Sequence, residues 1–452
     1  MKQSKAGGKV SGYARVGAGA VGGGALRVSR AWAEAGAGVQ KEVVDLSSIA
    51  FAVDAPARSK TQRLGAKERS TMRNVALDLG TRKISFCEVS ANEVVVRRTV
   101  TSLGALDDLL GKDAAPARVA VEACREAWHV HGELTKRGHE VLLVDTSRVR
   151  QLGIGQHGRK TDRIDAEVLA RAVERGTIPV AHLLSPERQQ LRKELGVRRA
   201  LVETRAQYVV IVRGLLRADG ITLGRCDTEH FVSHVRRASL SAEQRQNIAP
   251  LVLILEKVNE QLVAVDARLE TVCAREPAVA ALTTTPGVGL IVAAAFVSVI
   301  DEAKRFRHAH QVQAYVGLVP SENSSGERRR IGSITKHGNG YLRSMLVQAA
   351  WSILRTADRH DPLRVWAEQV AERRGKRIAV VALARRLAGV LWAIWRDGTV
   401  YDAAWIGQRS QRGLERQAQE ADVRAAAMKR AAHKAKVRMR PQRRRTAATT
   451  PA

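Results

Sequence analysis

The chain has 452 residues, and its 75 lysines and arginines outweigh 45 aspartates and glutamates, which gives a formal net charge of +30. A hydrophobic content of 45% excludes a wholly disordered or collagen-like chain, and the length allows two or three domains with cores of their own. Four scattered cysteines without a CxxC pair argue against a structural zinc site or disulfide framework and fit a reducing cytosol.

The positive charge is concentrated at the two ends of the chain. Residues 1–72 contain 12 basic and 5 acidic side chains, and residues 409–452 contain 13 and 3, so the ends hold over half of the excess. We predict a disordered, glycine-rich basic extension over 1–72, with Met72 as a candidate translation start. The basic tail over 405–452 either solubilises the protein or contacts phosphates without specificity. No run of 18 apolar residues occurs, so no membrane span is expected.

Residues 73–180 alternate short β-rich runs with turns and helical segments. The predicted strands are 74–80, 84–89, 93–100, 118–123 and 140–144, and the predicted helices are 103–110, 128–137 and 161–174. A three-stranded meander followed by alternating helix and strand is typical of a mixed sheet covered by helices, which places this part in the α/β class.

Four acids in this part form a candidate metal site. Asp78 lies inside an apolar strand, Glu122 ends another, and Asp162 and Asp165 share one face of the last helix. Carboxylates that face one pocket repel each other unless a cation neutralises them, and magnesium accepts such ligands. Taken singly, Asp78 is also explained as a paired strand acid, and the two helix acids as a solvated first turn.

The middle of the chain, residues 186–275, is predicted to be helical. Apolar residues recur at helical spacing over 187–219, where Arg198 and Arg205 interrupt the stripe. A second segment spaces seven apolar residues in three heptads: Leu251, Leu255, Val258, Leu262, Val265, Leu269 and Val272. This pattern predicts either an intermolecular coiled coil or a helical hairpin within one chain, and spacing alone does not separate the two.

The last predicted domain, residues 276–400, is mainly helical and holds two further candidate sites. Gly287 and Gly289 lie in a turn typical of a helix-hairpin-helix, where backbone N–H groups can bind phosphate; a simple helix-joining turn is the alternative. Ser324 and Ser325 precede a glycine in a block rich in basic residues. The candidate phosphate-binding side chains are Arg328, Arg329, Arg330, Lys336 and Arg343. Taken alone, a serine beside a glycine is commonly only a turn.

The motifs resemble one family of enzymes. The blocks are Ala76–Gly80, Ala120–Ala123, Lys160–Ala166 and, further on, Tyr315–Arg343. They resemble the DEDD and serine motifs of bacterial insertion-sequence transposases of the IS110 family and its IS1111 branch, whose members are guided by a bridge RNA. The resemblance implies a ribonuclease H-like domain of the Holliday-junction-resolvase type and a DNA recombinase of the bacterial cytoplasm and nucleoid.

What the resemblance implies for the site is specific. Asp78, Glu122, Asp162 and Asp165 would bind Mg²⁺ or Mn²⁺, and Ser325, with Ser324 as its possible substitute, would attack DNA and form a covalent phosphoserine. Dimers and tetramers would combine the acids of one subunit with the serine of another. Two other interpretations stay open: a resolvase-like nuclease in which water attacks, and a non-catalytic nucleic-acid-binding protein.

Overall fold

The computed structural model describes residues 72–146, 148–152, 162–325 and 330–408, together with the single positions 419, 428 and 430. The predicted extension over 1–72, except Met72, and most of the basic tail over 405–452 therefore lie outside the described residues. So do Arg328 and Arg329 of the serine block.

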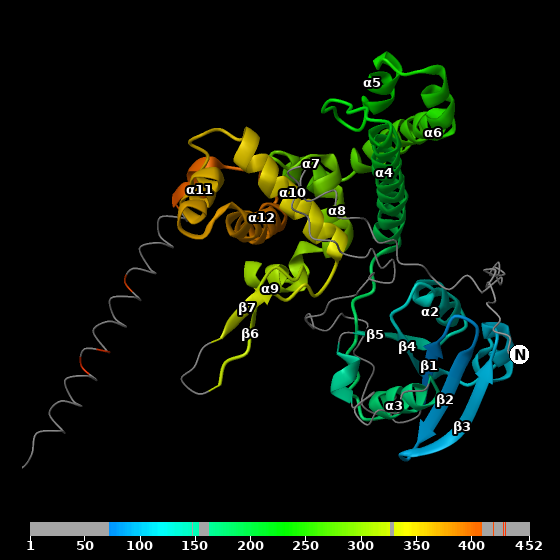
Figure 1. Ribbon diagram of the computed structural model, residues 1–452. Helices are drawn as coiled ribbons and strands as arrows, with labels where there is room; N and C mark the ends of the chain where they lie inside the picture. Colours follow the sequence, from blue (N-terminus) through cyan, green and yellow to red (C-terminus); the bar gives the residue numbers. More distant parts are fainter. Residues whose placement is uncertain are drawn as a thin grey trace, which may run out of the picture. The chain divides into compact units, whose positions relative to one another are not determined.

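The first part of the described chain is built on a five-stranded mixed sheet (Figure 1). Its strands are β1 (Arg73–Leu79), β2 (Ile84–Ser90), β3 (Glu93–Val100), β4 (Ala117–Glu122) and β5 (Glu140–Val144). Their order is β3-β2-β1-β4-β5, with β1, β2 and β3 antiparallel and β1, β4 and β5 parallel. Each strand lies within a residue or two of its predicted position. The predicted mixed sheet is confirmed.

Helices bury both faces of this sheet. On one face, α2 (Ala127–Lys136) and α1 (Asp107–Leu110), which follows the short 3₁₀ helix η4 (Leu103–Leu106), pack on Val75, Leu77, Val119 and Val121. On the other face, α3 (Asp162–Glu174) packs on Ala76, Cys87 and Ala120 through Leu169 and Val173. Alternate residues of β1 and β4 therefore enter different cores, as expected for strands buried on both sides.

Two long helices, α4 (Pro186–Ala218) and α6 (Ala242–Cys273), pack against each other within the chain. Each begins with a serine cap: Ser185 accepts from the Arg188 N–H, and Ser241 forms a capping box with Gln244. Five of the seven predicted heptad residues are buried, namely Leu255, Val258, Leu262, Val265 and Leu269. The short helix α5 (Phe231–Arg237) packs beside them.

The arginines that interrupt the apolar stripe of α4 bond to α6. Arg198 forms an ion pair with Asp266, and Arg205, which is buried, donates a 3.4 Å hydrogen bond to Asn259. Polar pairs inside an apolar seam fix the register of the two helices. These contacts agree with the interpretation of the heptads as a hairpin within one chain.

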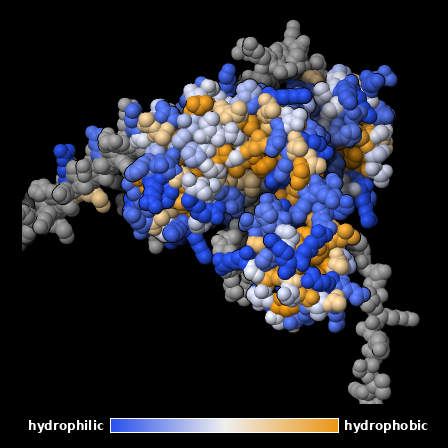
Figure 2. Space-filling view, turned by 90° about the horizontal axis from the view of Figure 1, so that it is seen from above, coloured by the Kyte–Doolittle hydropathy of each residue, from blue (hydrophilic) through white to orange (hydrophobic). Residues whose placement is uncertain are grey.

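Apolar side chains also remain on the outside. On the face shown in Figure 2, hydrophilic residues predominate and apolar residues gather in patches between them. Leu253 and Val263 of α6 are 60% and 71% exposed. Packing of α6 against another subunit therefore stays a prediction, in addition to the hairpin that α4 and α6 form within the chain.

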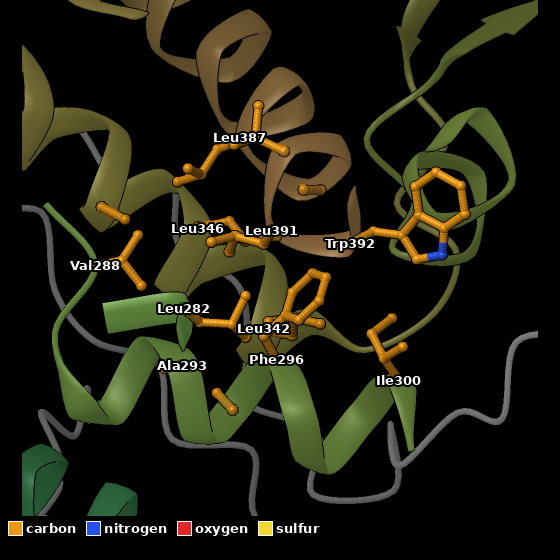
Figure 3. Close-up of a cluster of buried hydrophobic side chains, with 14 of the residues drawn as sticks. Leu282, Val288, Ala293, Phe296, Ile300, Leu342, Leu346, Leu387, Leu391 and Trp392 are labelled. Carbon is orange, nitrogen blue, oxygen red and sulfur yellow. The ribbon is translucent and has the colours of Figure 1, made fainter. Parts of the chain in front are cut away.

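The last part of the described chain is a helical bundle with one small hairpin. Its helices are α7 (Pro277–Thr283), α8 (Leu290–Ile300), α9 (Ala309–Tyr315), α10 (Gly340–Thr356), α11 (Pro362–Arg374) and α12 (Lys376–Asp397), with a 3₁₀ turn, η6 (Ala303–Arg305), before α9. Figure 3 shows Phe296, Leu342, Leu346 and Leu391 from three of these helices meeting in one core. Trp392 lies in the same core, and its indole N–H donates to the Ala303 carbonyl.

The helix α12 is long and apolar enough to cross a membrane by length and composition alone. Most of its apolar residues are instead buried in the bundle, as Leu387, Leu391 and Trp392 illustrate (Figure 3). The core position of α12 accounts for its composition.

The segment that leads into α4 is fastened to the end of α8 by Asp301. The buried Asp301 carboxylate lies 2.6 Å from His182 Nε2 and accepts a 3.0 Å hydrogen bond from Ser185 Oγ. Burial acts to raise the pKa of the Asp301 carboxyl, but the contacts with His182 and Ser185 outweigh it and hold the pKa below the usual value.

Candidate active site

Asp78 and Glu122 lie on the same face of the sheet, side by side at the ends of parallel strands. Leu77 of β1 is paired with Val121 of β4, and both side chains enter the core on the α2 face. The next residue on each strand, Asp78 or Glu122, points to the opposite face because side chains alternate. That is the face covered by α3. Both carboxylates are partly buried.

The other two acids lie on the first turn of α3. Asp165 is 3% exposed, whereas Asp162 is exposed. The Asp162 carboxylate lies beside Gly80, just after β1, where a Cβ built on the glycine would be 3.5 Å from Asp162 Oδ2. Because α3 packs on β1, β2 and β4, the fold brings the elements that carry all four acids together.

The donor set fits a divalent metal ion in kind, because four carboxylates supply the oxygen ligands that Mg²⁺ and Mn²⁺ accept. Among the described residues, however, no group of three or more Asp, Glu, His or Cys side chains is gathered closely enough to hold a metal ion. The described residues thus show the elements that carry the four acids brought together, and the metal site itself stays a prediction.

The predicted serine block forms a short antiparallel hairpin of β6 (Pro320–Glu322) and β7 (Ile331–Ile334). Ser324 is tied into it: its hydroxyl donates to Glu322 Oε1 at 2.9 Å and accepts from the Arg330 N–H at 3.2 Å. Ser325 is exposed, and no hydrogen bond in the described part of the chain occupies its hydroxyl. The two adjacent serines therefore have different surroundings.

Glu322, which accepts the hydrogen bond from Ser324, is not among the residues predicted from the sequence. The available signal was an acid two residues before a serine pair, a spacing common in turns. Of the predicted basic residues that the structure describes, Arg330 and Lys336 are exposed next to the hairpin.

Arg343 lies in different surroundings from those predicted. Its side chain is 8% exposed, and its Nη1 donates to the Val316 carbonyl at 3.1 Å and the His337 carbonyl at 3.0 Å. These carbonyls lie on the two chain segments that enter and leave the hairpin. The guanidinium group therefore joins the two segments at the base of the hairpin. Its contact with phosphate stays a prediction.

The base of the hairpin also requires Gly317. This residue has a φ of +76°, and a Cβ there would lie 2.0 Å from the His337 carbonyl oxygen. The Lys336 N–H donates to the Gly317 carbonyl at 3.1 Å. Only glycine permits this close approach of the two segments.

The predicted helix-hairpin-helix turn joins α7 to α8, but its two glycines differ. Gly287 has a φ of +73°, and a Cβ there would lie 2.8 Å from the Ala349 carbonyl oxygen of α10. Gly287 is therefore partly buried against α10. Its role in phosphate binding stays a prediction. Gly289 caps α8 and is exposed, with open space where a Cβ would stand.

Comparison with known proteins identifies the class of protein. Residues 279–363 match the model described as "Transposase IS116/IS110/IS902 family", and residues 75–218 match a DEDD model of the IS110 type described as "Transposase". The first match contains the serine hairpin, and the second contains all four acids. The chain is a DNA transposase, and its DEDD type of domain suggests dependence on a divalent metal.

Relatives identify the family. A "Probable family 20 transposase" of Pseudomonas aeruginosa is 30% identical over 338 residues, covering 72% of this chain and 98% of the relative. The transposase for the insertion sequence element IS1328 of Yersinia enterocolitica is 27% identical over 72% of this chain and 98% of its own length. The transposase for the insertion sequence element IS1111A of Coxiella burnetii is 27% identical over 61% of this chain and 77% of its own length. The chain belongs to the IS110 family of insertion-sequence transposases.

Proposed function

We propose that this transposase cuts and rejoins DNA through a covalent bond between DNA and Ser325. The observation that carries the proposal is the contrast between the two serines. The Ser324 hydroxyl is occupied by Glu322 and Arg330, whereas Ser325 is exposed on the same hairpin without a described hydrogen bond. A nucleophile must reach the phosphorus atom, and an exposed hydroxyl without a hydrogen bond to the described residues meets that requirement.

The proposed step conserves the phosphodiester energy. Ser325 Oγ forms a bond to phosphorus while one P–O ester bond of the DNA strand breaks. The departing oxygen gains a proton and becomes a free hydroxyl end, and the serine hydroxyl loses its proton. Attack by a hydroxyl end of another strand on the phosphoserine reverses the reaction and joins that strand.

Mg²⁺ or Mn²⁺ would be held by Asp78, Glu122, Asp162 and Asp165, and such an ion, when bound, neutralises the carboxylates and polarises a phosphate. The arrangement of the acids supports this assignment. Asp78 and Glu122 point from β1 and β4 toward α3, the helix that carries the other two acids.

The serine hairpin offers side chains for the DNA backbone. We propose that the exposed Arg330 and Lys336, with Arg328 and Arg329, contact phosphates beside Ser325, and that Gly289 leaves α8 open to another phosphate. Arg343 instead positions the hairpin through Val316 and His337.

The remaining parts of the proposal come from the family resemblance. A bridge RNA would select the DNA, and dimers and tetramers would complete an active site from the acids of one subunit and the serine of another. The ribonuclease H-like domain would span 73–180, the helical region 186–275 and the serine domain 276–400. The protein would act on DNA in the bacterial cytoplasm and nucleoid.

The test is the substitution Ser325→Ala, with Ser324→Ala as the matched control. Incubated with element-end DNA, guide RNA and Mg²⁺, the unmodified protein and Ser324→Ala should leave a protein–DNA adduct on a denaturing gel. Ser325→Ala should leave none. An adduct that is lost only in Ser324→Ala assigns the attack to Ser324 and overturns the proposal.

Two other outcomes identify the alternatives. Hydrolysed strand ends without any adduct from the unmodified protein would mean that water attacks, as in a resolvase-like nuclease. Binding without any metal-dependent cleavage or exchange would mean a non-catalytic nucleic-acid-binding protein.

A further inference from the structure

Four basic residues surround the single glycine between α11 and α12. Arg373 and Arg374 end α11, and Lys376 and Arg377 begin α12; we call these four residues, with Gly375, the basic turn. All five are exposed, and Gly375 has a φ of +84°. The nearest acid in sequence is Glu372. The basic turn lies outside both candidate sites described above.

Neighbouring arginines in the bundle have partners within the protein. Arg364 bonds to Glu368 and to the Ala357 carbonyl, Arg385 donates to Gln313, and Arg386 lies 4.8 Å from the centre of the Trp366 ring. In contrast, no side chain of the basic turn forms an ion pair with a carboxylate in the described part of the chain. The only described bond from these four side chains runs from Arg373 to the Gln369 carbonyl.

Two of the four cations occupy positions that do not favour helix stability. Cations are favourable at a helix C-terminus, which accounts for Arg373 and Arg374. Lys376 and Arg377 lie in the first turn of the 22-residue helix α12, where the helix dipole is positive. That turn contains no acid, and its cap, Gly375, supplies no side-chain acceptor. Local helix energetics therefore provide no reason for these two charges.

An anion resolves this unfavourable arrangement. A phosphate at the basic turn would neutralise clustered cations and accept hydrogen bonds from backbone N–H groups that lack a cap. Residues 369–380 contain no aromatic side chain on which an unpaired base could stack, so the turn suits the backbone of a duplex better than single-stranded bases.

We propose that the basic turn docks the phosphate backbone of duplex DNA without reading its sequence. The inference rests on the DNA recombination proposed above, and it adds a surface distinct from the serine hairpin. In this arrangement the bound duplex supplies the negative charge that α12 lacks at its N-terminus.

The test uses the double variant Lys376→Gln/Arg377→Gln of the full chain. Binding to a short random-sequence duplex DNA is measured in EDTA at several salt concentrations. We expect the Kd to rise roughly tenfold at physiological salt and the slope of log K against log salt to fall by about 2. The Tm of the DNA-free protein should rise by about 1–2 °C, because two cations leave a helix N-terminus.

The control is Arg355→Gln/Arg359→Gln, which removes the same charge from exposed positions in the same bundle. Arg355 lies in the last turn of α10, where the helix dipole favours a cation, so its loss should not raise the Tm. We expect the control to retain DNA affinity within about twofold.

Three outcomes would overturn the proposal. They are an unchanged Kd and salt slope in the basic-turn variant, an equal loss in the control, and a loss confined to a duplex RNA of the same length, which would make RNA the partner. Since no strand is cut in EDTA, these results do not depend on Ser325, and a missing serine adduct would not affect them.

Discussion

The acids of the sheet and the serine of the hairpin belong to one transposase, but different kinds of structure hold them. Asp78 and Glu122 continue strands whose preceding residues, Leu77 and Val121, are fully buried. Ser325 follows a three-residue strand that is exposed throughout. A core therefore fixes the acids, whereas hydrogen bonds and a glycine contact at the base of the hairpin fix the serine.

This difference teaches where each site is vulnerable. Strands buried on both faces keep their geometry when one polar side chain changes, because many apolar contacts hold the backbone. A two-stranded hairpin is marginally stable by itself and depends on the few residues that join it to the bundle. We therefore expect substitutions of the acids to lower activity with little change in stability. Substitutions around the serine should change both activity and stability.

The largest effect is expected for Asp78→Asn. Replacing one carboxylate of the candidate metal site should reduce metal-dependent strand exchange by on the order of 100-fold or more, because a ligand and a negative charge are lost. The Tm should change little, since the asparagine has the same shape on a strand fixed by its core. Exchange rates titrated with Mg²⁺, together with thermal unfolding, measure both quantities. A large loss of Tm would show that the Asp78 carboxylate, and not chiefly the core, holds this region.

The next effect is expected for Gly317→Ala. A methyl group would overlap the His337 carbonyl at a φ of +76°, so the base of the hairpin must open, at a cost of roughly 3 kcal/mol. Gly289→Ala is the control, because open space surrounds that position and its φ is −86°. Chemical denaturation of both variants compares them. Equal stability of the two would refute the close approach at Gly317.

The smallest effect is expected for Arg343→Met. The buried Val316 carbonyl and the partly buried His337 carbonyl lose their donor, which should destabilise the protein by about 1–3 kcal/mol and misplace Ser325. If Arg343 positions the hairpin, adduct formation at saturating DNA should slow while the Kd for DNA stays nearly constant. Arg343→Lys should restore part of the rate, since an ammonium group can still donate to a carbonyl.

The control for this variant is Arg355→Met, on the exposed side of the same helix. It should change neither the adduct rate nor the stability by a comparable amount. A rise in Kd with an unchanged rate in Arg343→Met would instead support the original prediction that Arg343 binds phosphate.

Much of the fold followed from local patterns. The five strands and α3 lie where alternation and helical periodicity predicted them, because each pattern reflects which side of the element is buried. The heptads of α6 predict an apolar seam, but the spacing leaves open whether the helix that covers it belongs to the same chain or to another. Arg198 and Arg205 interrupt the apolar stripe of α4, and their bonds to α6 explain why these two positions are polar.

The sequence predicted which types of residue form the candidate site, but it predicted the role of each residue less well. An acid within an apolar strand and a serine before a glycine are visible in sequence. A charge count cannot distinguish the exposed Arg330 from the buried Arg343, thirteen residues further along. Nor can it distinguish Gly287, packed against α10, from the open Gly289.

By itself, the sequence determined the order of the elements, the four acids, the serine pair and an excess of positive charge, since these depend on composition and short-range spacing. Only the tertiary structure decided that Asp78 and Glu122 lie on the sheet face that α3 covers, and that Ser324 is occupied while Ser325 is exposed. It also decided which cations have no carboxylate partner among the described residues. The physical reason is that burial, strand register and ion pairing depend on segments far apart in the chain, which come together only when the cores form.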